Sequence, residues 1–215
     1  LLEGKSLIKF LTGYEKAITA LERIDEKILS KLPDLKVIGK YGVGIDMIDL
    51  PAMNKYGVKL GWTKGVNKRS VSELVVSLSI LLLHKANFAN REVLNGKWYQ
   101  VKGNQLSNCK VGIIGCGNIG KDLVKLLKPF GCKILAFDIK NYKYFYKKNN
   151  VYPVDLDVLL KESDVISLHL PLNKSTKNII NFDKLKLLKR NAILINFARG
   201  GLIEEKYLYN LLKDK

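Results

Sequence analysis

Short apolar runs alternate with amphipathic segments along most of the chain, and this alternation predicts strands that alternate with helices. The apolar runs contain few polar residues, which is typical of parallel strands covered on both faces. We therefore predict an α/β fold built on parallel sheets. The expected strands are 7–11, 35–38, 58–62, 111–114, 133–137, 164–170 and 192–196.

Helical periodicity fills most of the segments between these strands. It predicts a helix over 14–30 and one long helix over 70–95, with Ser70 as its N-cap and Glu73 completing a capping box. Residues 139–150 are predicted to form a polar loop. The other expected helices are 49–56, 119–130 with Gly131 at its end, 156–160, 181–188 and 204–213.

The stretch 110–138 predicts a strand, a glycine turn, a helix and a second strand, and its turn has the pattern G-x-G-x-x-G. Gly115 permits the tight turn, Gly117 leaves the backbone open to a pyrophosphate, and Gly120 lets the helix pack closely on the strand. The helix N-terminus offers unpaired amides to the phosphates. Asp138 lies 18 residues after Gly120, near the roughly 20 expected for a carboxylate that binds the adenosine ribose.

This order of elements predicts a dinucleotide-binding domain, and a carboxylate that repels a 2′-phosphate favours NAD over NADP. We therefore expect two Rossmann-like parallel-sheet units, the second a doubly wound NAD-binding domain. Two alternatives stay open for the glycines. They can serve only a tight turn, or they can hold another nucleotide ligand, such as the adenosyl group of a methyltransferase cofactor.

The net charge of +17 comes from 32 lysines and only 5 arginines spread along the chain, and we interpret it as a solvated surface. The densest run, 140–148, interleaves lysines with aromatic rings that can stack on bases, but we expect no nucleic-acid partner. The longest apolar run, 74–83, is too short to span a membrane. The three cysteines lack metal-ligand spacing, so we expect reduced thiols in a cytoplasmic protein and no metal site.

Several stretches together resemble the D-isomer-specific 2-hydroxyacid dehydrogenases, the family that includes phosphoglycerate dehydrogenase. They are GVGIDMIDL (42–50), GVNKRSVSELVV (65–76), NGKW (95–98), GIIGCGNIG (112–120), SDVISLHLPLNKST (163–176) and INFARGGLIEE (195–205). The resemblance implies hydride transfer between NAD and C2 of a small D-2-hydroxy or 2-keto acid, with 3-phosphoglycerate-like substrates among the candidates. It also implies a homodimer that forms through 70–96.

The resemblance further implies a partial substrate-binding, flavodoxin-like domain over 1–66 and an NAD-binding Rossmann domain over 67–215, with the active site between them. The substrate would bind the amides of Val43 and Gly44 and the side chain of Asn67. Arg199 would be the catalytic arginine, because a guanidinium can grip a carboxylate and polarise the C2 oxygen. The expected cofactor-binding residues are Gly115, Gly117, Asn118, Ile119, Gly120, Asp138, Leu170, Pro171, Thr176, Phe197 and Ala198. Phe197 departs from the small hydroxyl residue usual in the family.

Neither histidine is expected to act as the general base. We interpret His84 as structural, and the resemblance places His169 at the end of a strand beside the cofactor. The family's base histidine and its glutamate partner follow the segment that resembles 195–205, beyond Lys215. We therefore expect a fragment that lacks both ends and the proton-transfer pair. The alternative is a naturally short module that binds NAD(H) without catalysis.

Overall fold

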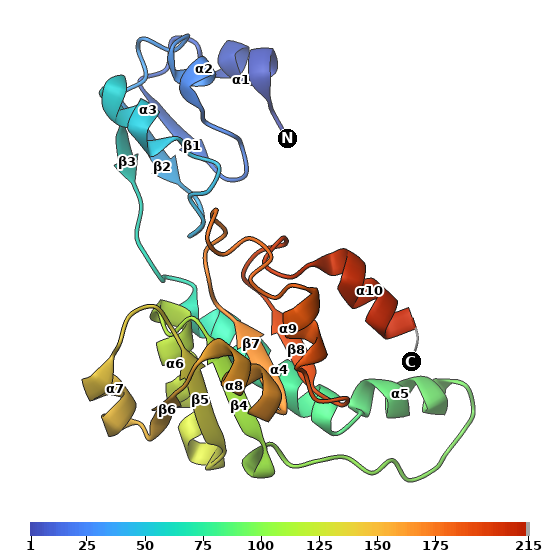
Figure 1. The fold of residues 1–215 in the computed structure, drawn as a ribbon. Helices are drawn as coiled ribbons and strands as arrows, with labels where there is room; N and C mark the ends of the chain where they lie inside the picture. The colour runs from blue at the N-terminus through green and yellow to red at the C-terminus, as the bar shows by residue number, and fades with distance from the viewer. Residues whose placement is uncertain (214–215) are drawn as a thin grey trace. The chain divides into compact units, whose positions relative to one another are not determined.

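The computed structural model describes residues 1–213, and the chain divides into two compact units, Leu1–Asn67 and Lys68–Lys215. Asp214 and Lys215, the last two residues of the predicted second domain, lie outside the described residues. Both units are parallel α/β structures, which confirms the predicted fold class (Figure 1).

The first unit contains three parallel strands in the order β1-β2-β3. Its elements are α1 (Gly4–Leu11), β1 (Lys16–Thr19), α2 (Glu26–Leu29), β2 (Val37–Lys40), α3 (Leu50–Lys55) and β3 (Lys59–Gly61). The predicted helix 49–56 is confirmed: Asp49 caps α3 by accepting from the Ala52 amide, and Gly57 follows it with a φ of +68°. The strands predicted at 35–38 and 58–62 are also found, with shifted ends.

The strand predicted over 7–11 is wrong, because this segment is helix α1. Leu7 and Leu11 are buried, whereas Phe10 between them is 63% exposed. A spacing of four between buried positions is the period of a helix and not of a strand. Glu3 is the N-cap of this helix, and the Ser6 hydroxyl accepts from the Glu3 amide and donates to the Glu3 carbonyl.

The helix predicted over 14–30 is also wrong, because β1 and α2 occupy this segment. Of the apolar positions that suggested a helix, Ile18 is 84% and Leu21 is 65% exposed, while Ile24 is buried. Residues 16–19 instead pair in parallel with β2 along its whole length. Pairing with β2 therefore decides the conformation of residues 16–19, despite the helical spacing of the apolar residues in this segment.

The second unit contains five parallel strands in the order β6-β5-β4-β7-β8. Numbered within the unit, this order is 3-2-1-4-5, which confirms the doubly wound arrangement. Its strands are β4 (Lys110–Ile114), β5 (Lys133–Phe137), β6 (Val151–Pro153), β7 (Val165–Leu168) and β8 (Ile193–Asn196). Its helices are α4 (Lys68–Leu83), α5 (Ala86–Leu94), α6 (Asn118–Leu127), α7 (Lys143–Lys148), α8 (Leu156–Glu162), α9 (Phe182–Lys186) and α10 (Glu205–Lys213), with short 3₁₀ turns η1 (Leu106–Asn108) and η2 (Lys128–Phe130).

Helices cover both faces of this sheet, so the strands are buried on both sides (Figure 1). On one face, α4 and α6 pack on Val111 and Ile113 of β4. On the other face, α8 and α9 pack on Ile114 and on the β7 residues Ile166 and Leu168. The alternating side chains of each strand therefore enter two separate cores.

The single helix predicted over 70–95 is two helices, because Lys85 adopts a left-handed φ of +54° between α4 and α5. The capping box is wrong as well, since α4 begins at Lys68 and Ser70 lies inside its first turn. None of the helices in residues 1–213 is by itself long and apolar enough to cross a membrane. Only α4 and α5 taken together reach that length and composition, and they meet at 61°.

The polar loop predicted over 139–150 contains helix α7 and leads directly into β6. Tyr146 is 4% exposed, and Tyr142 packs edge-on against its ring. Phe145 contacts the same ring, so the aromatic residues at 142, 145 and 146 form the helical face that was missed.

Candidate functional site

The glycine turn joins β4 to α6, and its three glycines have different surroundings. Gly115 has a φ of +95°, and a side chain there would meet the His169 carbonyl oxygen at 2.7 Å. A side chain at Gly120 would collide with the Gly115 carbonyl oxygen. A side chain at Gly117 would have no protein atom within 4 Å. The first and third glycines therefore serve close packing, and Gly117 faces open space.

The first turn of α6 presents free amides toward this open space. Gly117 is the N-cap, and no side chain caps the helix. Among residues 1–213, the amides of Asn118, Ile119 and Gly120 donate to no protein acceptor, and the first internal hydrogen bond runs from the Lys121 amide to the Gly117 carbonyl. Unpaired amides at the positive end of a helix dipole form an anion site.

Asp138 follows β5 and is tied directly to the glycine turn. Its Oδ2 accepts from the Cys116 amide at 2.7 Å, and its Oδ1 accepts from the Lys140 amide at 2.8 Å. A carboxylate has about four lone-pair sites, so two remain for ligand hydroxyls. Asp138 thus lies beside the anion site, where the ribose of a dinucleotide is expected.

Two buried groups next to the turn are inert at neutral pH. Burial raises the pKa of the Cys116 thiol to about 11, so this cysteine stays protonated. Burial lowers the pKa of His169 to about 4, so its imidazole stays neutral. His169 Nε2 lies 3.0 Å from the Ser167 hydroxyl, and its Nδ1 is buried without a hydrogen-bond partner among the described residues.

The loop after β7 contains Leu170 and Pro171, and hydrogen bonds to the Asn173 side chain close it. The Asn173 Oδ1 accepts from the Thr176 amide at 3.1 Å, and the Thr176 hydroxyl donates to the Pro171 carbonyl at 2.6 Å. Thr176 therefore holds the loop in one conformation through bonds within the loop. Asn173 was not singled out from the sequence, although an asparagine three residues before a threonine is a common turn signal.

A second asparagine organises the loop after β8 that carries Arg199. The Asn196 Nδ2 donates to the Arg199 carbonyl at 2.7 Å, and its Oδ1 accepts from the Ala198 amide at 3.1 Å. The Arg199 guanidinium donates to the Ala198 carbonyl at 2.7 Å. Phe197, which lies between Asn196 and Ala198 in the sequence, is 36% exposed. Asn196 is the second site residue that sequence reasoning missed.

These loops follow β4, β5, β7 and β8, and parallel strands bring all four to the same edge of the sheet. The chain leaves β4 toward β5 on one side and returns to β7 on the other, so the glycine turn lies at the topological switch point. The structure thus gathers the predicted cofactor residues and Arg199 at one edge. The predicted residues Val43, Gly44 and Asn67 belong to the first unit.

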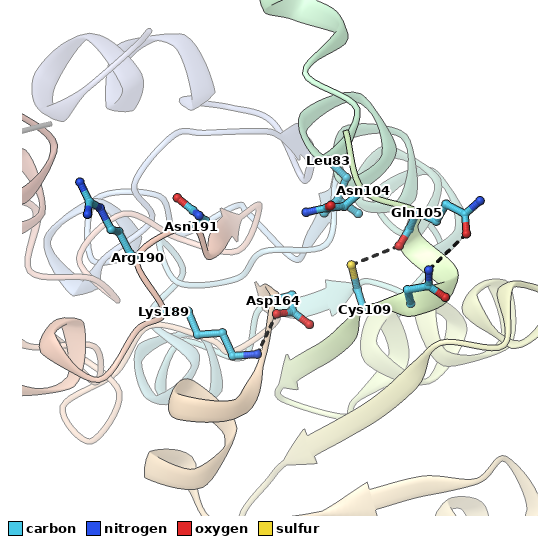
Figure 2. Close-up of a pocket in the computed structure, with 9 residues that line it drawn as sticks. Leu83, Asn104, Gln105, Cys109, Asp164, Lys189, Arg190 and Asn191 are labelled. Carbon is cyan, nitrogen blue, oxygen red and sulfur yellow. Dashed lines mark hydrogen bonds and ion pairs between the residues drawn. The ribbon is translucent and has the colours of Figure 1, made fainter. Parts of the chain in front are cut away.

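A polar pocket in the second unit lies at the opposite edge, beside the amino ends of β4 and β7 (Figure 2). It measures about 430 Å³, and its lining residues include Cys109, Asp164 and Lys189. None of the predicted site residues is among the described residues that line it.

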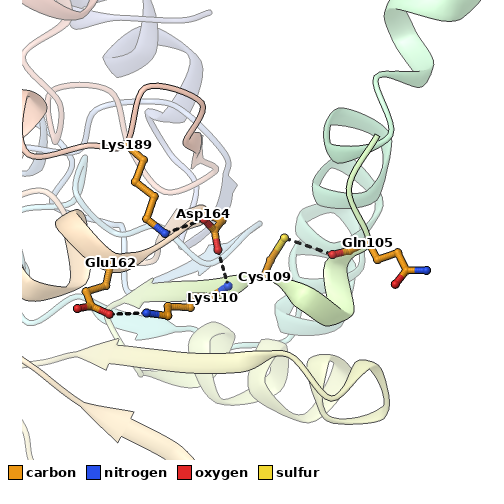
Figure 3. A network of polar contacts seen from close by, with 6 residues as sticks. All are labelled: Gln105, Cys109, Lys110, Glu162, Asp164 and Lys189. Carbon is orange, nitrogen blue, oxygen red and sulfur yellow. Dashed lines mark hydrogen bonds and ion pairs between the residues drawn. The ribbon is translucent and has the colours of Figure 1, made fainter. Parts of the chain in front are cut away.

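Asp164 at this edge is the centre of a structural network (Figure 3). It accepts from the Lys110 amide and the Lys189 ammonium, both at 2.7 Å. Burial favours a higher pKa for Asp164, but these two hydrogen bonds outweigh it and hold its pKa below the usual value. The network therefore ties the amino end of β4 to Asp164, which precedes β7, and to Lys189.

The glycine turn, the free amides and Asp138 at a switch point define the second unit as a dinucleotide-binding Rossmann domain. Residues 76–215 match the family model of the D-isomer specific 2-hydroxyacid dehydrogenase NAD binding domain. The chain belongs to the D-isomer-specific 2-hydroxyacid dehydrogenase family, and its second unit is the NAD-binding domain of that family.

Three relatives show the range of the family. The chain is 35% identical to glyoxylate reductase from Thermofilum pendens over 203 residues, which are 90% of this chain and 59% of that protein. It is 36% identical to D-3-phosphoglycerate dehydrogenase from Methanocaldococcus jannaschii over 195 residues, 89% of this chain and 37% of that protein. D-lactate dehydrogenase from Aquifex aeolicus, solved with NAD and lactic acid, matches with a TM-score of 0.89 and 31% identity over 96% of this chain and 63% of that one. The chain thus spans less than two thirds of each relative's length.

Proposed function

We propose that the full-length protein is an NAD-dependent oxidoreductase that transfers a hydride between nicotinamide and C2 of a small D-2-hydroxy or 2-keto acid. The observation that carries this proposal is the position of Arg199 on the same sheet edge as the glycine turn. Bound NADH supplies the hydride in the reducing direction. The named relatives act on glyoxylate, D-3-phosphoglycerate and D-lactate, which share a carboxylate next to the reacting carbon.

The proposed substrate site in the first unit is the glycine-rich turn after β2. Gly42 has a left-handed φ of +98°, and the amides of Val43 and Gly44 donate to no protein acceptor among residues 1–213. Successive free amides in such a turn form a nest for an anion, and the substrate carboxylate fits it. The Oδ1 of Asn67 is buried without a hydrogen-bond partner among the described residues, which supports its proposed role as a contact to a polar ligand.

Arg199 is the proposed catalytic residue. Its guanidinium would bind the substrate carboxylate and the C2 oxygen, and it would stabilise the negative charge that develops on that oxygen as the hydride arrives. Asn196 holds the backbone of this loop, so the charge is positioned before the substrate binds. His169 has no proton-transfer role in this proposal, because desolvation lowers its pKa to about 4 and makes its imidazole a weak base at neutral pH.

The Arg199→Ala variant tests this assignment. We expect kcat/KM for 2-keto acid reduction to fall roughly 10²–10³-fold, the usual effect of removing one group that stabilises an oxyanion. The matched control is Arg190→Ala, because Arg190 lines the pocket at the opposite edge of the sheet. Steady-state NADH oxidation by the full-length gene product is measured with a panel of small 2-keto acids.

Three other outcomes would contradict the proposal. Equal activity of the two arginine variants would remove Arg199 from the chemistry. A full-length product that binds NADH but reduces no acid in the panel would indicate a non-catalytic binding module. Tight binding of adenosylmethionine with no binding of NADH would indicate a different nucleotide ligand.

We also infer a homodimer that forms through 70–96. In the second unit, Leu94 is 79% and Trp98 is 88% exposed, and Val93 beside them is 50% exposed. Large apolar side chains grouped in this way are typical of protein–protein contacts. Light scattering of the full-length protein tests the inference: a mass of two chains supports it, and a mass of one chain contradicts it.

A further inference from the structure

Helix α6 carries a buried carboxylate one turn behind the amides that face the anion site. Asp122 is 6% exposed and lies four residues after Asn118. Residues four apart share one face of a helix and are separated by about 6 Å along its axis. The Asp122 side chain also leans toward the helix N-terminus. An anion at this position opposes the binding of a negatively charged pyrophosphate unless a cation compensates it.

Arg69 in the first turn of α4 supplies that cation. Its Nη2 donates to the Asp122 Oδ1 at 3.0 Å, while the Asp122 Oδ2 is buried and has no hydrogen-bond partner among the described residues. Ser72 on the same helix is fully buried, and its hydroxyl approaches the Ile119 carbonyl at 3.3 Å. The Ser72 contact and the ion pair therefore both join the start of α4 to the start of α6.

We propose that Arg69 sets the affinity of the glycine turn for the dinucleotide by cancelling the charge of Asp122. The inference rests on the placement of the cofactor pyrophosphate at the N-terminus of α6. If the pair only held the two helices together, loss of either member would weaken binding. Charge cancellation predicts opposite effects instead, because loss of Arg69 leaves an anion near the phosphates and loss of Asp122 leaves a cation.

The experiment measures NADH dissociation constants at pH 8 and low salt for the full-length protein and three variants. They are Arg69→Met, which keeps the aliphatic stem, Asp122→Asn, which keeps the shape, and the double variant. We expect Arg69→Met to weaken NADH binding about three- to tenfold and Asp122→Asn to strengthen it by a similar factor. The double variant is expected to bind like the wild type, and all differences should shrink in 1 M salt.

Two further variants separate this pair from the general surface charge and from folding. Lys68→Met removes a neighbouring exposed cation that, unlike Arg69, makes no ion pair among the described residues, and we expect its effect on the dissociation constant to stay within about 1.5-fold because water solvates its charge. Arg69→Lys keeps the charge and is expected to stay within about twofold of the wild type. Adenosine, which lacks phosphates, should bind all variants equally well.

The proposal is overturned if both single substitutions weaken NADH binding, if neither changes it, or if adenosine binding shifts in parallel. A double variant that binds as poorly as Arg69→Met would also overturn it. Should Arg69→Met not fold, the sign of the Asp122→Asn effect still decides. A wild-type protein that binds no NADH at all refutes the proposed function itself. That result is distinguishable from failure of the charge-cancellation proposal, in which the wild type binds NADH but the variants do not show the expected differences in dissociation constant.

Discussion

Gly115 and Gly117 stand two residues apart in the same turn, yet substitution of the first is expected to lower stability and substitution of the second to weaken cofactor binding. Gly115→Ala places a methyl group against the His169 carbonyl at a positive φ, so we expect the free energy of unfolding to fall by about 2–4 kcal/mol. Gly117→Ala meets no protein atom within 4 Å. It should change stability by less than about 0.5 kcal/mol, but weaken NADH binding at least about tenfold because the methyl group occupies the phosphate space.

Denaturant unfolding and NADH titration of both variants check this prediction. A Gly117→Ala variant that binds NADH normally would mean that the open space beside Gly117 does not hold the cofactor.

The buried imidazole of His169 makes stability depend on pH. Its pKa is lowered from 6.5 to about 4, so between these values the unfolded chain binds a proton that the native chain does not. Stability is therefore full above pH 6.5 and falls as the pH drops toward 4, by about 3 kcal/mol in total. We expect unfolding curves of His169→Asn to lose this part of the slope. His84→Asn, which changes the exposed histidine, should keep it, and equal slopes in the two variants would contradict the assignment.

At the scale of single residues, the motif positions of the proposed site were easier to predict from the sequence than the residues that stabilise the loops around it. Gly117 and Asp138 belong to a motif whose spacing suits a phosphate and a ribose, and Gly115 belongs to the same motif through the tight turn that it permits, so a motif search finds all three. Asn173 and Asn196 instead satisfy local backbone groups of their own loops. Such bonds depend on loop geometry that forms only when the strands are in place, so sequence spacing alone does not reveal them.

Helix α7 supports the glycine turn through one buried ring. Tyr146 is 4% exposed and lies close enough to the Cys116 thiol that each influences the other's pKa. We expect Tyr146→Ala to lower the free energy of unfolding by about 3–4 kcal/mol, as for other large buried rings. Tyr144→Ala is the matched control on the same helix, because Tyr144 is 80% exposed, and it should cost less than about 0.5 kcal/mol.

Denaturant unfolding compares the two tyrosine variants. Equal stabilities would show that the α7 ring is not part of the core that holds the turn.

At the scale of elements, prediction succeeded where local and tertiary signals agreed. The apolar run of β4 and the amphipathic pattern of α6 were both predicted, because their apolar residues are the ones that pack in the core. Prediction failed for β1, whose Ile18 faces solvent and whose conformation comes from pairing with β2. It also failed at Lys85, where no glycine or proline marks the break between α4 and α5.

At the scale of the whole molecule, the parallel α/β class and the doubly wound second unit followed from the order of the elements. A strand, a glycine turn and a helix repeat through the chain, and right-handed crossovers leave few ways to arrange them. The position of β4 at the switch point then follows, because β5 and β7 must lie on its two sides. The roles of Val43, Gly44 and Asn67 could not be reached in this way, because they depend on a ligand.

The central claim is hydride transfer to C2 of a 2-keto acid, and labelled cofactor tests it most directly. The full-length gene product is incubated with NADH deuterated at C4 of the nicotinamide, in separate preparations for each face of the ring, together with small 2-keto acids. The account predicts a D-2-hydroxy acid that carries deuterium at C2 from one of the two preparations, detected by mass spectrometry and chiral chromatography. Product without deuterium from either preparation, product of L configuration, or no product with any acid would contradict it.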